Sequence, residues 1–146
     1  MKYNDLYWMN KVYKLSLNAF KNKEVPVASI LVFKNKIISK SYNKIITKND
    51  SIAHAEIIVL RKSKEFLNKN LNITMYVTLE PCLMCIGAIY NSKIKKLVYG
   101  ASCNKIGSIN FLKNIYNNIY IKNIIKIKSG ILINKCSNIL KNFFKQ

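Results

Sequence analysis

The sequence predicts an α/β protein with a single domain, residues 1–146, in which one sheet is covered by helices on both faces. Segments with helical apolar spacing alternate along the chain with short apolar runs typical of buried strands. The resulting order of helix, hairpin, helix, strand, helix and strand is typical of a three-layer α/β/α domain. No repeat or linker interrupts this order, and a chain of 146 residues is long enough to build one core.

The N-terminal segment predicts an amphipathic helix followed by a β-hairpin. Apolar side chains recur at spacings of three and four along one face of this helix: Leu6, Met9, Tyr13, Leu17 and Phe20. Asn4 or Asp5 is suited to cap the first turn, because either side chain accepts from a free amide N–H. Pro26 ends any helix, after which the apolar run 27–33 indicates a buried strand and 37–42 its hairpin partner.

The middle of the chain predicts two helices and the strand between them. The polar segment 43–51 is rich in Asn and Asp, which favour turns. A helix is expected over 54–68, followed by a strand over 73–79. Pro81 suits the beginning of the next helix, since a first-turn position needs no amide N–H.

The C-terminal part completes the sheet and its helical cover. We expect a fourth strand over 96–101, a loop over 102–110, a short helix over 111–116 and a fifth strand over 119–128, where repeated Lys weakens the alternation. Gly130 marks a turn. The last helix has core spacing on one face: Leu132, Cys136, Ile139, Leu140 and Phe143.

Two short motifs carry the chemistry. Cys82 and Cys85 lie three residues apart, so a helix projects both side chains from one face. Two thiolates and the imidazole of His54 suit Zn²⁺ and leave a fourth position open, as catalytic zinc sites do. Glu56 is then placed to handle the proton of a water in that position. The spacing H-x-E and P-C-x-x-C, with Pro81 before the first Cys, is typical of zinc nucleobase deaminases.

Simpler interpretations of each motif residue remain open at this point. A single CxxC pair also serves redox chemistry or forms half of a structural zinc site. A single His is more often an ordinary hydrogen-bonded residue than a ligand. The combination of Pro81, His54, Glu56 and the CxxC pair favours catalytic zinc over these alternatives.

The composition of the chain limits where the protein can be located and which partners it can bind. No apolar stretch of about 18 uncharged residues occurs, and the first residues lack the apolar core of a signal peptide, so we expect no membrane association. Cys103 and Cys136 have no evident disulfide partner, which favours the reducing cytoplasm. The formal charge of +19 permits RNA binding, but abundant Lys, Asn, Ile and Tyr beside the single Arg61 also fit an A/T-biased genome.

Beyond the zinc motif, the chain resembles the bacterial tRNA-specific adenosine deaminases almost from end to end. The resemblance is carried by the following stretches: Glu24-Val25-Pro26-Val27, Asn43, Ala53-His54-Ala55-Glu56, YVTLEPCLMCIG at 76–87, Val98-Tyr99-Gly100-Ala101, Gly130-Ile131-Leu132 and Phe143-Phe144. It implies a cytidine deaminase-like fold with a five-stranded mixed sheet, one Zn²⁺ per chain and a homodimer. The implied reaction is hydrolytic deamination of adenosine to inosine at the wobble position of an arginine tRNA, with ammonia as the second product.

The same resemblance implies roles for five further residues. Asn43 would hydrogen-bond the edge of the extruded base; Pro26, Val27 and Leu83 would shape its pocket; and Phe144 would pack near the anticodon stem-loop. Simpler alternatives exist for four of them. Asn43 could be only a turn residue, and Val27, Leu83 and Phe144 could be only core or helix-packing residues.

Two rival functions remain in view. The first is a deaminase of free guanine, cytidine or a pterin-like molecule, because the zinc motif is common to those enzymes. The second is an inactive zinc-bearing RNA-binding module, which the intact Glu56 disfavours. Cys103 stands where the family usually has an acidic residue, in a shortened loop, so that loop's base contacts are not carried over.

Overall fold

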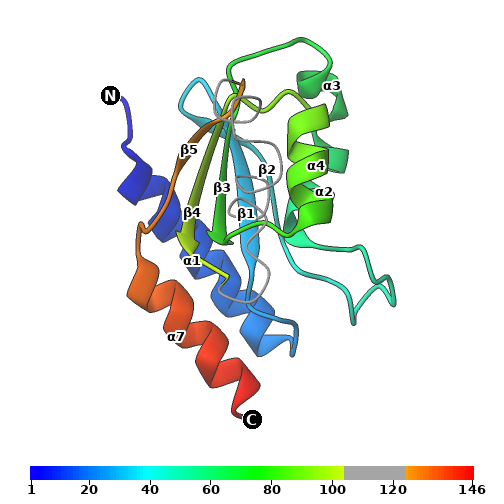
Figure 1. Ribbon diagram of the computed structural model, residues 1–146, viewed down its shortest axis with the longest axis vertical. Helices are drawn as coiled ribbons and strands as arrows, with labels where there is room; N and C mark the ends of the chain where they lie inside the picture. The colour runs from blue at the N-terminus through cyan, green and yellow to red at the C-terminus, as the bar shows by residue number, and fades with distance from the viewer. Residues whose placement is uncertain (104–123) are drawn as a thin grey trace.

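The computed structural model describes residues 1–103 and 124–146, which form a sheet between two layers of helices (Figure 1). The elements follow in this order: α1 (Asp5–Lys21), β1 (Ala28–Phe33), β2 (Lys36–Tyr42), α2 (Ala55–Lys62), α3 (Lys64–Leu67), β3 (Thr74–Leu79), α4 (Leu83–Asn91), β4 (Lys96–Ala101), β5 (Lys126–Lys128) and α7 (Ile133–Phe144). The predicted α/β class with one helix-covered sheet is confirmed.

The sheet is mixed and has five strands in the order β2-β1-β3-β4-β5. The hairpin partner β2 and the central strand β3 both run antiparallel to β1, whereas β3, β4 and β5 run parallel. Parallel neighbours need a crossover, and α4 supplies the one between β3 and β4. As a result, the segment after β3 and the start of α4 lie at the carboxyl edge of the parallel strands (Figure 1).

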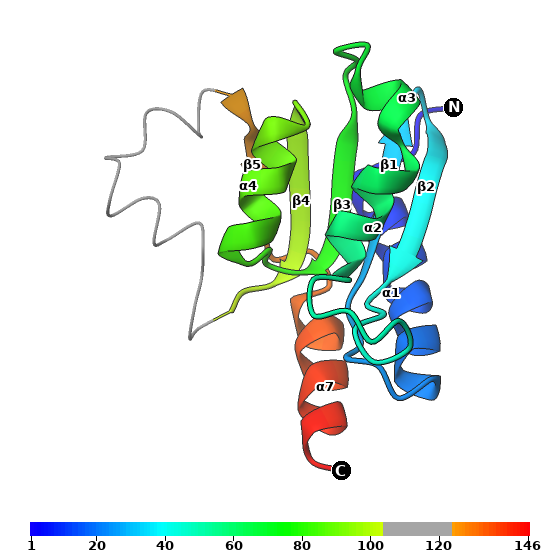
Figure 2. The same ribbon diagram turned by 90° about the vertical axis from the view of Figure 1, so that its right-hand side faces the viewer.

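Alternation along the strands divides the core into two clusters. Met75, Val77 and Leu97 face the layer of α2 and α4, while Tyr76 and Val98 face the layer of α1 and α7. The turned view in Figure 2 shows α2 and α4 in front of the sheet and α1 behind it. None of the helices in the two described ranges combines the length and apolar character needed to cross a membrane.

The first helix forms as expected, but it buries a different face. Asn4 caps it, its side-chain oxygen accepting from the Tyr7 N–H at 2.9 Å. The buried residues are Trp8, Met9, Val12, Ser16 and Ala19; of the expected stripe, Met9 is buried, Tyr13 is half-buried against the core, Phe20 is half-buried against Phe143, and Leu6 and Leu17 were wrong. Leu6 and Leu17 are exposed instead.

An ion cluster at Asp5 fixes this rotation of the helix. Asp5 accepts from the Tyr76 hydroxyl at 2.7 Å and lies 2.9 Å from Lys96 Nζ and 3.1 Å from Lys128 Nζ. These partners come from β3, β4 and β5. They bring Asp5 against the sheet, and the residues on its face of the helix are buried with it.

Two other boundaries differ from expectation. The helix expected over 54–68 is interrupted at Ser63, whose hydroxyl donates to Ser39 Oγ at 2.7 Å; Ser39 in turn donates to the Val59 carbonyl at 3.0 Å. This tertiary hydrogen-bond chain ends α2 and α3 follows.

Within the described part of the strand expected over 119–128, only Lys126–Lys128 is strand. The expected helix 111–116 and most of the loop 102–110 lie outside the described residues.

Candidate metal centre

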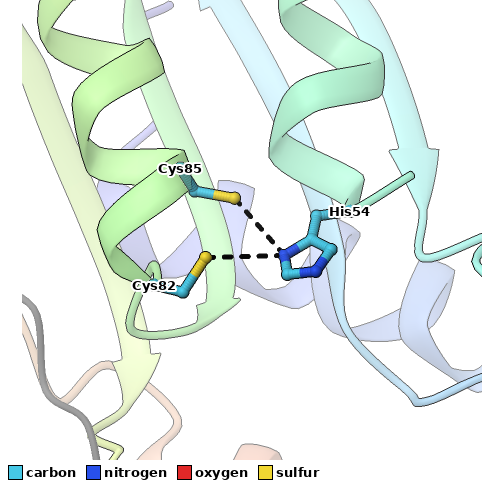
Figure 3. Close-up of side chains that lie close together, drawn as sticks. All are labelled: His54, Cys82 and Cys85. Atoms are coloured by element: carbon cyan, nitrogen blue, oxygen red, sulfur yellow. Dashed lines mark hydrogen bonds between the residues drawn. The ribbon is translucent and has the colours of Figure 1, made fainter. Parts of the chain in front are cut away.

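Two helix beginnings meet at the carboxyl edge of the sheet. His54 is the N-cap residue of α2 and Cys82 is the N-cap residue of α4; both have extended backbone geometry, and neither side chain caps its own helix. His54 therefore lies just before the first turn in which it was expected. Their side chains point toward each other, with Cys85 one turn further along α4 (Figure 3). Both helix N-termini direct positive dipole ends toward this point, which favours thiolate and other negative groups.

The distances between these side chains suit a single metal ion. His54 Nδ1 lies 3.6 Å from Cys82 Sγ and 3.5 Å from Cys85 Sγ (Figure 3). A nitrogen and a sulfur bound tetrahedrally to zinc, at about 2.1 and 2.3 Å, lie about 3.6 Å apart. Within the described ranges these three residues are the one His/Cys/Asp/Glu group that could hold a metal, and no fourth side chain joins them. The residues fit a zinc ion with one position left open.

Hydrogen bonds among Cys82, Cys85 and His54 shift the pKa of each of these side chains. Hydrogen bonds from the Cys85 thiol and from His54 lower the pKa of Cys82 to about 4. The bond to Cys82, together with burial, raises the pKa of Cys85. The bond to the Cys82 thiolate outweighs burial and raises the pKa of His54. The lowered pKa favours the thiolate form of Cys82, which is the form that binds metal.

Glu56 lies beside the Cys85 sulfur and outside the ligand group. Its side chain is 4% exposed, and Oε2 lies 3.6 Å from Cys85 Sγ, to which the thiol donates. Burial raises the pKa of this carboxyl, with smaller effects from its charged neighbours. A buried carboxyl with a raised pKa beside a metal site is suited to accept and return protons.

Known proteins with this geometry were found by sequence and by structure. The model of the MafB19-like deaminase family matches residues 3–146. The tRNA-specific adenosine deaminase of Buchnera aphidicola subsp. Schizaphis graminum is 51% identical, covering 99% of this chain and 97% of that protein. The enzyme of the same name from Haemophilus influenzae is 43% identical over 84% of this chain and 73% of its own length.

The chain belongs to the tRNA-specific adenosine deaminase family.

Solved structures agree with this membership. A structure from a study of A-to-I editing by tRNA:A34 deaminases at the wobble position has a TM-score of 0.80 and 32% identity, covering 92% of this chain and 99% of its own. The guanine deaminase of Nitrosomonas europaea has a TM-score of 0.81 at 20% identity, covering 98% of this chain and 86% of its own. The second likeness shows the fold alone. The chain is a deaminase with the cytidine deaminase-like fold.

In this family member, Asn43 lies in the loop between β2 and α2, and backbone hydrogen bonds fix the start of that loop. The Asn43 amide N–H donates to the Val27 carbonyl at 2.9 Å, and the Lys44 N–H donates to the Ala53 carbonyl at 3.0 Å, next to His54. The Asn43 side-chain oxygen accepts from the Ile45 N–H at 3.1 Å. Asn43 therefore does form a turn, which bonds its backbone to Val27 before β1 and its neighbour Lys44 to the residue before His54.

The four other expected substrate residues differ in exposure. Pro26 is buried, and Val27 is buried in the core cluster beneath α2 and α4. Leu83 follows Cys82 in α4 and is 41% exposed, so it is not a core residue. Phe144 is 69% exposed at the end of α7, where its ring contacts that of Phe143 at 5.3 Å between centroids. Helix packing alone does not account for Phe144.

One residue had no role assigned from the sequence. Glu24 is 1% exposed, and its Oε1 accepts from the Ile46 N–H at 2.8 Å, which ties the loop after Asn43 to the segment before β1. Its other oxygen has no hydrogen-bond partner among the described residues. The sequence does contain a signal for Glu24: it is a carboxylate just before the apolar strand, in a chain with only six acidic residues.

Proposed function

We propose that this protein converts adenosine to inosine at wobble position 34 of an arginine tRNA by hydrolytic deamination, with release of ammonia. The observation that carries the reaction class is the His54, Cys82 and Cys85 group with an open fourth position and buried Glu56 beside it. The substrate rests on the relatives named tRNA-specific adenosine deaminase, including one at 51% identity over almost the whole chain.

One zinc ion per chain is the proposed cofactor. His54 would bind it through Nδ1, the ring nitrogen that faces both sulfur atoms, and Cys82 and Cys85 would bind as thiolates. When bound, zinc supplies a Lewis acid that allows water to act as a nucleophile at neutral pH.

Glu56 would carry the protons of the reaction. It takes a proton from the water that attacks C6 of adenine and delivers a proton to N1. It then takes the remaining proton from the hydroxyl now on C6 and passes it to the amine as the C–N bond breaks, so that ammonia leaves and the C6 carbonyl of inosine forms. Its burial and its raised pKa support this role, because a carboxyl that holds a proton more readily than usual can both accept and donate one.

The surrounding residues would hold the base at the metal. We assign Asn43 to the base edge, Pro26, Val27 and Leu83 to the pocket wall, and Phe144 to contact with the anticodon stem-loop. The position of Asn43 beside Val27 and the residue before His54, and the exposure of Leu83 and Phe144, support these assignments. Extruding a loop base costs less than opening a duplex, which favours an RNA loop as substrate.

A homodimer in the cytoplasm completes the proposal. Leu83 and Met84 at the start of α4 are exposed apolar side chains beside the metal ligands, as expected of a surface that a second copy covers. All four cysteines are free thiols, which fits a reducing compartment. Sedimentation equilibrium of the zinc-loaded protein tests the dimer; a monomer at micromolar concentration would refute it.

The experiment that tests the function compares substrates in parallel. The zinc-loaded enzyme is incubated with an arginine tRNA anticodon stem-loop carrying adenosine at position 34, with the same stem-loop carrying guanosine there, and with free adenosine, guanine and cytidine. Ammonia and inosine are measured for each. We expect turnover of the adenosine stem-loop only, and Asn43→Ala should lower its rate more than its affinity.

The outcome also separates the rival function. Fast turnover of free guanine or cytidine with an inert stem-loop would assign the protein to the small-molecule deaminases, whose fold it has. Turnover of none of these substrates by a zinc-loaded protein would leave the RNA-binding module as the correct interpretation.

A further inference from the structure

A second cavity lies at the opposite end of the sheet from the metal centre. Its volume is about 580 Å³, within the range of small-molecule sites, and it opens where β3 and β4 begin. The metal centre follows the end of β3, so six-residue strands separate the two by about 17–20 Å. Figure 1 shows the starts of β3 and β4 at the end of the sheet away from the starts of α2 and α4. We call this cavity the basic hollow.

The basic hollow has an excess of positive charge. Its wall includes Asp5 and five lysines: Lys2, Lys34, Lys95, Lys96 and Lys126. The single carboxylate is already held by Lys96 and by Lys128 at the rim. Across residues 1–103 and 124–146, the other four wall lysines have no carboxylate within 4 Å. Like charges in one concave wall repel each other, and a polyanion relieves that repulsion.

Backbone pairing holds three of the wall lysines on two adjacent segments. Sheet pairing sets Lys126 opposite Lys96, and the Lys126 N–H donates to the Lys95 carbonyl at 2.9 Å. The spacing of their backbones is therefore set by the sheet. Lysines presented this way suit a group with several oxygens, such as a phosphate.

An aromatic wall stands beside the lysines. Tyr3 is 38% exposed and stacks on Tyr7 with 3.9 Å between centroids, and it meets the ring of Trp8 edge-on at 5.6 Å. Asn35 fixes this wall: its side-chain oxygen accepts from the Tyr3 N–H at 3.0 Å, and its amide donates to the Met1 carbonyl at 2.6 Å. A fixed, half-exposed ring next to clustered cations is suited to a ligand with a flat base and a phosphate.

We propose that the basic hollow is a second binding site, distinct from the metal centre, for a nucleoside phosphate whose phosphates contact Lys95 and Lys126 and whose base contacts Tyr3. The ligand is either a free nucleotide or one unit of an RNA strand, since both present this chemistry. The proposal does not depend on the reaction at the metal centre.

Trp8 provides the measurement, because it is the only tryptophan in the chain and lines the hollow. Its fluorescence is followed while the zinc-loaded protein is titrated with ADP, with tripolyphosphate and with a ten-nucleotide oligouridine that cannot be deaminated. We expect a saturable change with ADP or oligouridine, and weaker binding of tripolyphosphate, which has no base. If ADP binds more tightly than oligouridine, the ligand is a free nucleotide; if oligouridine binds more tightly, the ligand is a unit of an RNA strand.

Matched variants separate this site from general surface charge. The double variant Lys95→Ala/Lys126→Ala should weaken binding at least about tenfold and reduce the slope of log affinity against log salt by about 1–2. The control Lys14→Ala/Lys141→Ala removes two exposed lysines of α1 and α7 and should change affinity less than about twofold. Tyr3→Leu should remove the preference for ADP over tripolyphosphate. Circular dichroism checks that each variant is folded.

Three results would overturn the proposal. The first is the absence of a saturable signal with all three probes at millimolar concentration. The second is equal weakening by the two double variants, which would show that only net charge matters. The third is an unchanged ratio of ADP affinity to tripolyphosphate affinity in Tyr3→Leu, which would exclude a base contact at Tyr3.

Discussion

Gly100 is the position at which a single added methyl group should damage this fold most clearly. It lies buried in β4, and a Cβ built there would meet Cys136 Sγ at 2.6 Å, the Thr78 carbonyl oxygen at 2.9 Å and the Ile131 carbonyl oxygen at 3.0 Å. The two carbonyls belong to β3 and to the turn before α7, so they cannot rotate away as a side chain would. The methyl group must therefore push β4 away from its neighbours.

The expected magnitude follows from these contacts. Overpacking a core costs typically about 1–3 kcal/mol, and two backbone contacts place Gly100→Ala at or above about 3 kcal/mol. For a chain near 150 residues this lowers the melting temperature by roughly 6–12 °C. Urea unfolding of zinc-loaded protein at fixed protein concentration measures the loss, since metal and self-association also change stability.

Gly87 gives a matched control for the same chemical change. It lies in α4, and no described atom lies within 4 Å of a Cβ built there. Gly87→Ala should therefore stabilise the protein by up to about 1 kcal/mol, because alanine favours the helix. A free energy of unfolding for Gly100→Ala within about 0.5 kcal/mol of wild type would refute the packing argument. A large loss at Gly87 would show that another surface covers that helix face.

Three further predictions concern the metal centre and the Asp5 cluster. Cys85→Ala should abolish zinc binding while Cys103→Ser keeps one zinc per chain, as metal analysis of the purified proteins will show; unchanged zinc in the first variant would exclude Cys85 as a ligand. Glu56→Gln should keep zinc and fold but lower the rate of inosine formation by about 10²–10⁴; half of the wild-type rate would make Glu56 structural. Asp5→Asn should cost about 1–3 kcal/mol at pH 7. Burial acts to raise the pKa of Asp5, but hydrogen bonds, first that of Lys96, outweigh it and the pKa is lowered. Its contribution is therefore complete above the unfolded value of 3.8 and disappears as the pH falls through the folded pKa, so wild type and variant should converge in urea unfolding at low pH.

Local pattern was enough to predict most elements and the chemistry of the metal centre. The strand 96–101 and the order of helices and strands in the described ranges depend on neighbours in sequence, and the structure confirms them; of the two expected caps, Asn4 and Asp5, the structure has Asn4. Cys82 and Cys85 could be identified because a CxxC at a helix start presents both sulfurs in one direction whatever the rest of the fold does. The pairing of these residues with His54 was recognised from the motif, because spacing along the chain does not bring segments 28 residues apart together.

What the sequence left open was decided by contacts between distant segments. α1 carries apolar side chains on two faces, and the bonds from Tyr76 and Lys96 to Asp5 select the face that is buried. The helix after His54 stops at Ser63 because a hydroxyl on β2 lies within hydrogen-bond reach. The basic hollow likewise depends on sheet pairing, which sets Lys126 opposite Lys96 and bonds its N–H to the Lys95 carbonyl. Periodicity reports which residues avoid water, but it does not report which partner they meet, and that choice requires the folded chain.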